Sequence, residues 1–241
     1  MKNQLLALAA LGLLAGAAQA QSSFEGFYGQ LSTGYESNQA STLGGTGTQT
    51  GSPTENWNTA NQNFNGMPLI AGLGYNWSLD SHWMLGLGAD YSFLSLKTGT
   101  YSSNNQYATT VNGQQLQVSN RTNIYLTPGY ALSKDQLVYL KAGYSSANLQ
   151  NTFPTTSTSG GVTKNIIATN GSATNTQQGY IVGLGYKQMV TSGLYGFAEA
   201  NYISYSKTTF STTYPGTTPY TISSSPTLNT YQALVGIGYK F

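Results

Sequence analysis

The sequence predicts an all-β fold, an eight-stranded antiparallel up-and-down transmembrane β-barrel. Three observations predict it. Apolar and polar residues alternate over many short stretches, which is the two-residue period of strands. Only 7% of the 241 residues are charged, whereas charged residues make up about a quarter of a typical soluble domain. Short turns alternate with long polar segments, as in barrels that cross a membrane. A soluble β-sandwich is the alternative fold, but its outward face would be polar.

Residues 1–20 have the three parts of a secretory signal. A positive start precedes a short apolar core, and Ala18-Gln19-Ala20 supplies the small-x-small cleavage site. The apolar core is too short to span a bilayer as a helix. We therefore expect a signal peptide at 1–20 and a single outer-membrane β-barrel domain at 21–241.

The first four expected strands are 26–36, 68–78, 83–94 and 116–130. Each has bulky apolar residues on one face and small or polar residues on the other. The outward set of these four strands is Phe27, Leu31, Thr33, Tyr35, Leu69, Ala71, Leu73, Tyr75, Trp77, Trp83, Leu85, Leu87, Ala89, Tyr91, Phe93, Leu116, Val118, Thr122, Ile124, Leu126, Pro128 and Tyr130. Pro128 lacks a backbone N–H group, which is tolerable near the end of a strand.

The last four expected strands are 138–145, 180–187, 194–205 and 230–241. The final one, TYQALVGIGYKF, has aromatic residues at both ends of its apolar face. The strand at 194–205 is the least regular, because turning Glu199 inward also turns Tyr195 and Phe197 inward. The opposite register would place the charge of Glu199 in lipid, which is costly.

Four long polar segments, rich in Ser, Thr, Asn, Gln and Gly, separate these strands at 37–66, 98–114, 150–176 and 207–225. We expect them to be loops without regular structure. Three short turns, at 79–82, 133–136 and 190–193, alternate with them. An even number of strands places both termini with the short turns on the periplasmic side, and the four loops outside the cell.

The inward face combines glycines with large side chains. Ten glycines fall on it, beside Tyr125, Tyr139, Ile181, Tyr195 and Phe197, which predicts small-against-large packing in a narrow interior. The glycines are Gly72, Gly74, Gly86, Gly88, Gly129, Gly143, Gly183, Gly185, Gly236 and Gly238. The alternative is that these glycines only mark bends.

Charged residues also fall on the inward face, where each must be paired. We expect Asp90 and Glu199 to form one cluster with Arg121 and Lys141 midway along the lumen. The cluster would be a structural plug or, alternatively, the lining or gate of a conducting path.

Aromatic residues are expected at the membrane–water interface. The candidates are Trp77, Trp83, Tyr130, Tyr186, Tyr239 and Phe241.

Three GLGY-like repeats, at Gly72–Tyr75, Gly183–Tyr186 and Gly236–Tyr239, accompany the signal, the eight strands and the terminal Phe241. Together they resemble the small outer-membrane β-barrel family of the OmpA transmembrane domain, OmpX and the opacity proteins. The resemblance implies a monomer in the outer membrane of a Gram-negative bacterium, in contact with lipid and lipopolysaccharide. It also implies that the barrel-assembly machinery reads Tyr239 and Phe241 as its signal. The chain ends with the barrel, so a tether to the cell wall is not implied.

Catalytic and metal chemistry have little support in the sequence. His82 is the single histidine, it lies in an expected turn, and Cys is absent. We therefore expect no enzyme activity, no cofactor and no metal, and a formal charge of +2 does not suggest nucleic acid.

The expected function is a structural and surface role: membrane integrity, adhesion or contact with a host or environmental ligand through the four loops. The alternative is a narrow passive pore for ions or small solutes, and a lipid-modifying enzyme is less favoured.

Overall fold

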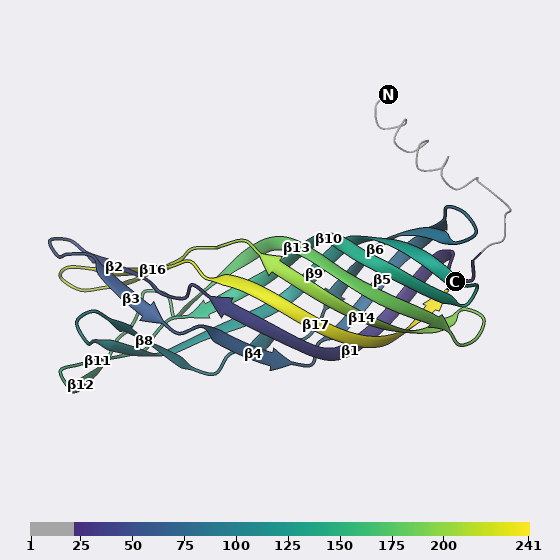
Figure 1. Ribbon diagram of the computed structural model, residues 1–241. Coiled ribbons are helices and arrows are strands. Elements are labelled where there is room, and N and C mark those ends of the chain that lie inside the picture. Colours follow the sequence, from purple (N-terminus) through teal and green to yellow (C-terminus); the bar gives the residue numbers. More distant parts are fainter. Residues whose placement is uncertain (1–21) are drawn as a thin grey trace, which may run out of the picture.

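The computed structural model describes residues 22–241, so the predicted signal peptide lies outside the described residues (Figure 1). The described chain forms seventeen strands joined in antiparallel pairs. They are β1 (Gly26–Ser41), β2 (Gly45–Gln49), β3 (Glu55–Thr59), β4 (Gln62–Gly66), β5 (Leu69–Ser78), β6 (Trp83–Ser92), β7 (Leu96–Lys97), β8 (Tyr101–Asn105), β9 (Thr110–Ser133), β10 (Gln136–Thr152), β11 (Thr156–Ser159), β12 (Val162–Asn165), β13 (Ser172–Met189), β14 (Leu194–Tyr205), β15 (Phe210–Tyr214), β16 (Tyr220–Ser224) and β17 (Thr227–Lys240). Within residues 22–241, no helix is long and apolar enough to cross a bilayer.

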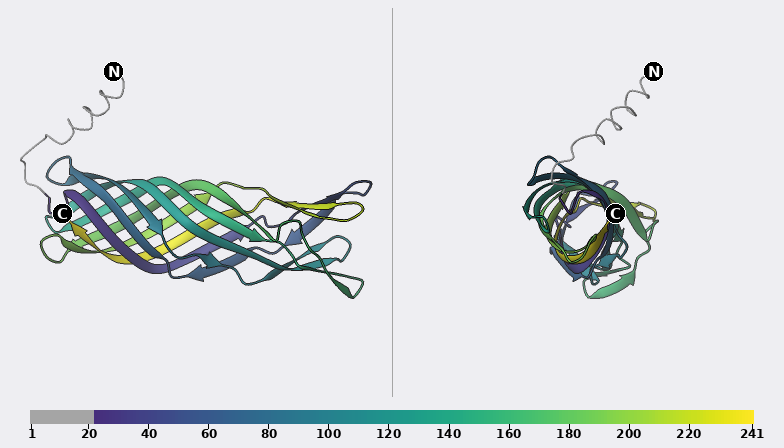
Figure 2. Two further views of the ribbon diagram at one scale, coloured as in Figure 1. Left: turned by 180° about the vertical axis from the view of Figure 1, so that it is seen from behind. Right: turned by 90° about the vertical axis from the view of Figure 1, so that its right-hand side faces the viewer.

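Eight of these strands pair into a closed antiparallel ring. The order is β1–β5–β6–β9–β10–β13–β14–β17, and β17 pairs back with β1. The view along the long axis shows this ring end-on (Figure 2). Every strand of the ring has two neighbours, so the ring has no free edge at which another chain could add a strand.

The two ends of the ring differ. One end, which we call the turn end, carries the C-terminus and the short turns at 79–82, 134–135 and 190–193 (Figure 1). The other, the loop end, carries the remaining hairpins. The three predicted turns are thus present, and the second is shorter than expected because β9 and β10 each extend into it.

The prediction of four loops without regular structure is wrong. At the loop end β12, β11, β9, β8, β3, β2, β16 and β15 pair in that order as a second sheet that continues the ring. Thr-rich segments such as β11 suit a strand, because a β-branched side chain packs well on a pleated surface. Most ring strands, up to the 24 residues of β9, are accordingly longer than the roughly 9–11 residues needed for a membrane crossing, whereas β5 and β6 have 10 residues each.

Side-chain alternation along the ring mostly follows the prediction, with one exception on β9. Leu116 and Val118 were expected to face outward, but both are buried inside. The cause is a β-bulge, in which Asn120 and Arg121 together oppose Ala147 of β10. Asn120 has a φ of 52°, a left-handed conformation that Asn tolerates. The extra residue reverses the alternation, so Arg121 and Val118 both point inward.

Glycine and large residues do pack against each other inside the ring. A Cβ atom at Gly185 would overlap the ring of Tyr139, and one at Gly238 would overlap the ring of Tyr195. Likewise Gly236 lies against Phe197. At these positions only glycine leaves room for the neighbouring aromatic ring, which supports the small-against-large interpretation over simple bends.

Candidate functional site

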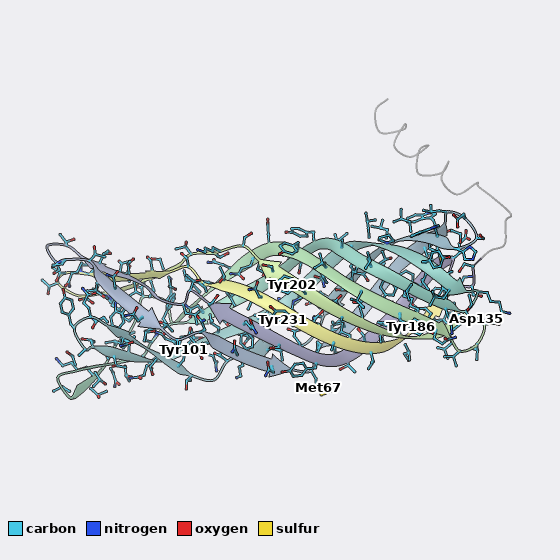
Figure 3. The ribbon with its side chains drawn as sticks, viewed as in Figure 1. Met67, Tyr101, Asp135, Tyr186, Tyr202 and Tyr231 are labelled. Atoms are coloured by element: carbon cyan, nitrogen blue, oxygen red, sulfur yellow. The ribbon has the colours of Figure 1, made fainter. Side chains whose placement is uncertain are left out.

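The outward face of the ring carries an aromatic belt at the turn end. Trp83, Tyr239 and Phe241 are more than 45% exposed there. Rings of neighbouring strands touch, as Trp83 and Tyr130 do with centroids 5.2 Å apart. The structure places all six residues predicted from the sequence in this belt: Trp77, Trp83, Tyr130, Tyr186, Tyr239 and Phe241. Figure 3 shows Tyr186 close to this end, near Asp135 of a turn.

A second aromatic belt lies further along the ring; the sequence indicated it on the last strand, but its members were not among the predicted interface residues. Tyr202 and Tyr231 lie side by side in it, with ring centroids 5.1 Å apart (Figure 3). Its outward members are Tyr35, Tyr91, Phe93, Tyr144, Tyr180, Tyr202 and Tyr231. The sequence held the signal, because Tyr231 and Tyr239 bound the outward face of β17. Two aromatic belts with aliphatic residues between them are typical of a strand ring that crosses lipid.

Leu184→Arg tests the band between the belts. Leu184 is 61% exposed on the outer face of β13, and an arginine there would meet hydrocarbon. We expect it to lower the free energy of unfolding in lipid vesicles by about 2–4 kcal/mol. The control is Ile167→Arg, because Ile167 is also exposed but lies in the loop-end extension. Equal losses in the two variants would contradict the band.

Inside the ring, Lys141 joins two of the predicted carboxylates. Its ammonium Nζ lies 3.0 Å from Asp90 Oδ2 and 2.8 Å from Glu199 Oε1. Tyr139 donates its hydroxyl to Glu199 Oε2 at 2.8 Å, and the ring of Tyr125 lies 3.9 Å from Nζ. All three charged side chains are at least 95% buried. Strands β6, β10 and β14 thus meet through one cation at the centre of the lumen.

Arg121 does not join this group, so the prediction of a single four-charge cluster is wrong. Its Nη1 donates to Glu36 Oε2 instead, and its Nε donates to the Tyr205 hydroxyl at 2.9 Å. Nη2 donates to Asn38 and Thr230 at 3.3 Å each. This partner was not predicted because Glu36 stood at the end of an expected strand, whereas β1 continues to Ser41.

A third buried cation, Lys187, lies towards the turn end. Its Nζ is 4.2 Å from the ring centre of Tyr28, 5.1 Å from that of Tyr195 and 5.2 Å from that of Tyr139. Ring faces attract an ammonium group electrostatically. Among the described residues the buried charges then balance, as Glu36, Asp90 and Glu199 against Arg121, Lys141 and Lys187.

The lumen is therefore filled in layers. Aromatic and aliphatic side chains fill the turn end, among them Phe24, Tyr28 and Phe197. The charged and amide side chains occupy the middle. A second apolar layer, which includes Leu116, Ile181 and Phe210, closes the loop end. Such an arrangement links strands on different sides of the ring through side chains that meet inside it.

His82 lies in the exposed turn at 79–82. Its Nδ1 is 2.8 Å from Ser81 Oγ. Asp80 Oδ1 accepts the backbone N–H groups of Trp83 and His82, and these bonds lower the pKa of the Asp80 carboxyl. The carboxylate of Asp80 is thereby engaged with the turn backbone.

Three solved outer-membrane protein structures align with this chain at 11–12% identity. The outer membrane protease OmpT of Escherichia coli aligns with 11% identity, a TM-score of 0.49 and coverage of 93% of this chain and 99% of OmpT. OprG of Pseudomonas aeruginosa aligns with 11% identity and a TM-score of 0.47, and the alignment covers 90% of this chain and 96% of OprG. Ail of Yersinia pestis aligns with 12% identity and a TM-score of 0.38, and the alignment covers 90% of this chain and 99% of Ail. A comparison with curated protein sequences finds no match.

The family comparison covers almost the whole chain. Residues 6–241 match the family described as outer membrane protein β-barrel domain. The closed antiparallel ring and the two aromatic belts are the features that this family description leads one to expect. The chain belongs to the outer membrane protein β-barrel domain family, and its location is the outer membrane of a Gram-negative bacterium.

Proposed function

We propose that the protein is an eight-stranded transmembrane barrel with a closed lumen. The barrel strengthens the outer membrane, and the second sheet at the loop end (β2, β3, β8, β11, β12, β15, β16 and the adjoining part of β9), which we call the platform, is presented to the surroundings. The observation that carries the proposal is the continuation of the ring past its second aromatic belt. On β10, Tyr144 belongs to that belt and the strand continues to Thr152. The platform beyond it is built of paired strands, so its hairpins are held more rigidly than free loops would be.

The chemistry of the platform supports contact with uncharged surfaces. Its strands are rich in Ser, Thr and Asn, with Tyr101, Tyr107 and Tyr220 among its aromatic residues. Hydroxyl and amide groups offer hydrogen bonds without long-range electrostatic attraction. We therefore propose a neutral host or environmental ligand rather than nucleic acid, and no enzymatic activity. The C-terminal Tyr239 and Phe241 remain the proposed signal for the assembly machinery.

Labelling of single cysteines tests the orientation. The natural chain has no cysteine, so one introduced thiol reports alone. We expect Thr217→Cys, exposed in the β15–β16 hairpin, to react with a membrane-impermeant maleimide on intact cells. Ser192→Cys, exposed in a turn, should react only after the outer membrane is permeabilised. The reverse pattern would contradict the proposed platform.

A strain lacking the protein distinguishes membrane strengthening by the barrel from surface contact by the platform. If the protein strengthens the membrane, this strain should take up more of a large dye that the outer membrane normally excludes. If the barrel itself is responsible, a chain with the β11–β12 hairpin shortened should restore the barrier fully. If surface contact is responsible, only the full chain should restore attachment.

A narrow passive pore is the second candidate, and one observation favours it. Asn123 Oδ1 and Asn201 Oδ1 are buried in the middle layer, and no hydrogen-bond partner for either lies among the described residues. Polar atoms of this kind suit a path for water. Conductance in a planar bilayer decides between the two candidates, because the closed lumen predicts a folded but electrically silent chain. Stable small channels that change with Glu199→Gln would establish the pore instead.

A further inference from the structure

An open groove, which we call the wall groove, crosses the outer wall of the ring, and its volume is about 700 Å³. Two parallel rows of outward side chains line it, and each row joins residues that pair across neighbouring strands. The first row is Trp83, Tyr130, Val138, Tyr186, Ala198 and Val235, on β6, β9, β10, β13, β14 and β17. The second row lies two residues nearer the loop end and includes Leu140, Leu184, Ala200 and Ala233.

The depth of the wall groove comes from alanines that lie between larger side chains. Ala198 lies between Tyr186 and Val235 in the first row. Leu184 is 61% exposed and Val235 is 60% exposed, so both project from the wall. Ala200 continues the floor beside Leu184 in the second row. The floor is therefore bordered by bulky apolar side chains.

The wall groove is polar only where it reaches the aromatic belt of the turn end. Its outward lining side chains are apolar apart from the indole N–H of Trp83 and the hydroxyls of Tyr130 and Tyr186. Glu199 also borders the groove, but its carboxylate is bonded to Lys141 inside the ring at 2.8 Å. A polar end at the membrane–water interface and an apolar remainder match the two parts of a membrane lipid.

The course of the wall groove matches one leaflet of the membrane. Trp83 is the first residue of β6, next to the turn at 79–82, whereas Val235 lies midway along β17. The first row crosses six strands and thus five strand spacings of about 4.8 Å, or roughly 24 Å in all. A row at right angles to strands tilted by about 45° therefore rises roughly 17 Å along the membrane normal. One leaflet is half of a hydrocarbon core about 30 Å thick, so the groove runs from the interface to the middle of the membrane.

We propose that the wall groove holds one acyl chain of a phospholipid from the periplasmic leaflet. The head group lies at the belt beside Trp83 and Tyr130, and the chain passes over Ala198 to Val235. The choice of leaflet rests on the proposed orientation, in which the turn end is periplasmic.

A lipid chain fits this groove better than a second copy of the protein does. The groove is continuous with the apolar band between the two belts, so its occupant comes from within the membrane. A flexible chain follows an oblique groove and contacts the floor along its length. The convex wall of a second ring would touch the rims and leave the alanine floor without partner atoms, which forfeits the dispersion attraction there.

Native mass spectrometry in detergent tests the proposal on chain purified from outer membranes and stripped of lipid. Dioleoyl phosphatidylethanolamine should bind saturably, with one molecule per chain, and glycerophosphoethanolamine, which lacks acyl chains, should not bind. The double variant Ala198→Leu, Ala200→Leu fills the floor and should weaken lipid binding about tenfold. The matched control is Ala142→Leu, because Ala142 is exposed on the outer face of β10 between Leu126 and Val182, outside the wall groove. This control should bind as the natural chain does.

Folding does not confound this test. Leucine at an exposed position of the lipid-facing band removes no hydrogen bond, so the double variant should unfold in lipid vesicles at no lower denaturant concentration than the natural chain. Electron spin resonance in vesicles gives a second measurement without detergent. Spin-labelled phosphatidylethanolamine should show an immobilised component with the natural chain and with Ala142→Leu, and the double variant should lose it.

Four results would overturn the proposal. They are no binding of phosphatidylethanolamine by the natural chain, unchanged binding by the double variant, retention of lipopolysaccharide in place of phospholipid, and a dimer in vesicles that the double variant abolishes. The last would make a second copy the occupant. None of them measures the orientation of the ring, which the labelling of Ser192→Cys reports separately, or the barrier that the barrel gives the membrane, which dye entry reports.

Discussion

Lys141→Met is expected to be the most destabilising substitution in the chain. The ammonium of Lys141 is the shared partner of Asp90 and Glu199, and all three side chains are almost fully buried. Methionine fills a similar volume but leaves two carboxylates facing each other without a cation. Removing one partner of a buried ion pair lowers stability by about 3–5 kcal/mol, and here two acceptors lose their partner together. Denaturant unfolding of the chain in lipid vesicles, followed by tryptophan fluorescence, measures the loss.

Two controls separate charge from volume in this experiment. Lys207→Met removes an exposed lysine and should leave stability unchanged. The triple variant Asp90→Asn, Lys141→Met, Glu199→Gln removes all three charges at nearly constant shape, so it should regain most of the lost stability. A triple variant as unstable as Lys141→Met alone would show that packing around the lysine stem, and not its charge, holds β6, β10 and β14 together.

Alternation was enough to predict the ring. On β17, Tyr231, Val235 and Tyr239 face outward as expected, because the two-residue period of a strand is set by local geometry alone. The same logic placed Glu199 inward on β14, where the structure buries it. The cost of a charge in lipid resolved the ambiguous register, so an energetic argument corrected a weak pattern.

The loop end could not be predicted in the same way. Segments such as β2 and β12 have four or five residues, and their pairing depends on neighbours far away in sequence. The Phe210–Tyr214 segment does alternate, with Phe210 and Thr212 buried and Ser211 exposed. That signal was present, but a five-residue pattern in a Ser/Thr-rich region does not identify its partner strand.

The pairing of the interior charges depends on register and on the bulge. The alternation of side chains predicts Asp90, Lys141 and Glu199 inside the ring, and the register of the strands brings them together. Arg121 was also predicted inside the ring. Its separation from Asp90, however, depends on the register between neighbouring strands, which the residue pattern of a single strand does not show. The bulge at Asn120 was equally hidden, since one added residue moves Leu116 from outside to inside without changing the local composition.

Arg121→Met is expected to have the second largest effect. The side chain of Arg121 is 97% buried, and its guanidinium group donates to Glu36, Tyr205, Asn38 and Thr230, so four groups lose a donor together. Glu36 keeps Gln232 and Asn38 as donors, at 2.8 and 2.9 Å, but loses its counter-charge. We expect a loss of about 3–5 kcal/mol in the free energy of unfolding.

A double-mutant cycle with Glu36→Gln shows whether the ion pair or the hydroxyl and amide bonds carry this loss. If the ion pair dominates, Arg121→Met should destabilise the Glu36→Gln background much less than the natural chain, with a coupling of about 2–3 kcal/mol. Additive losses would assign the stability to Tyr205 and Thr230 instead. Unchanged stability together with unchanged conductance in Arg121→Met would contradict both a structural and a gating role. The bulge places the apolar side chains of Leu116 and Val118 inside the ring, next to Arg121. If the role of Arg121 is structural, Arg121→Met should therefore also loosen the platform. Faster amide hydrogen exchange in the part of β9 that precedes Asn120 would measure this effect.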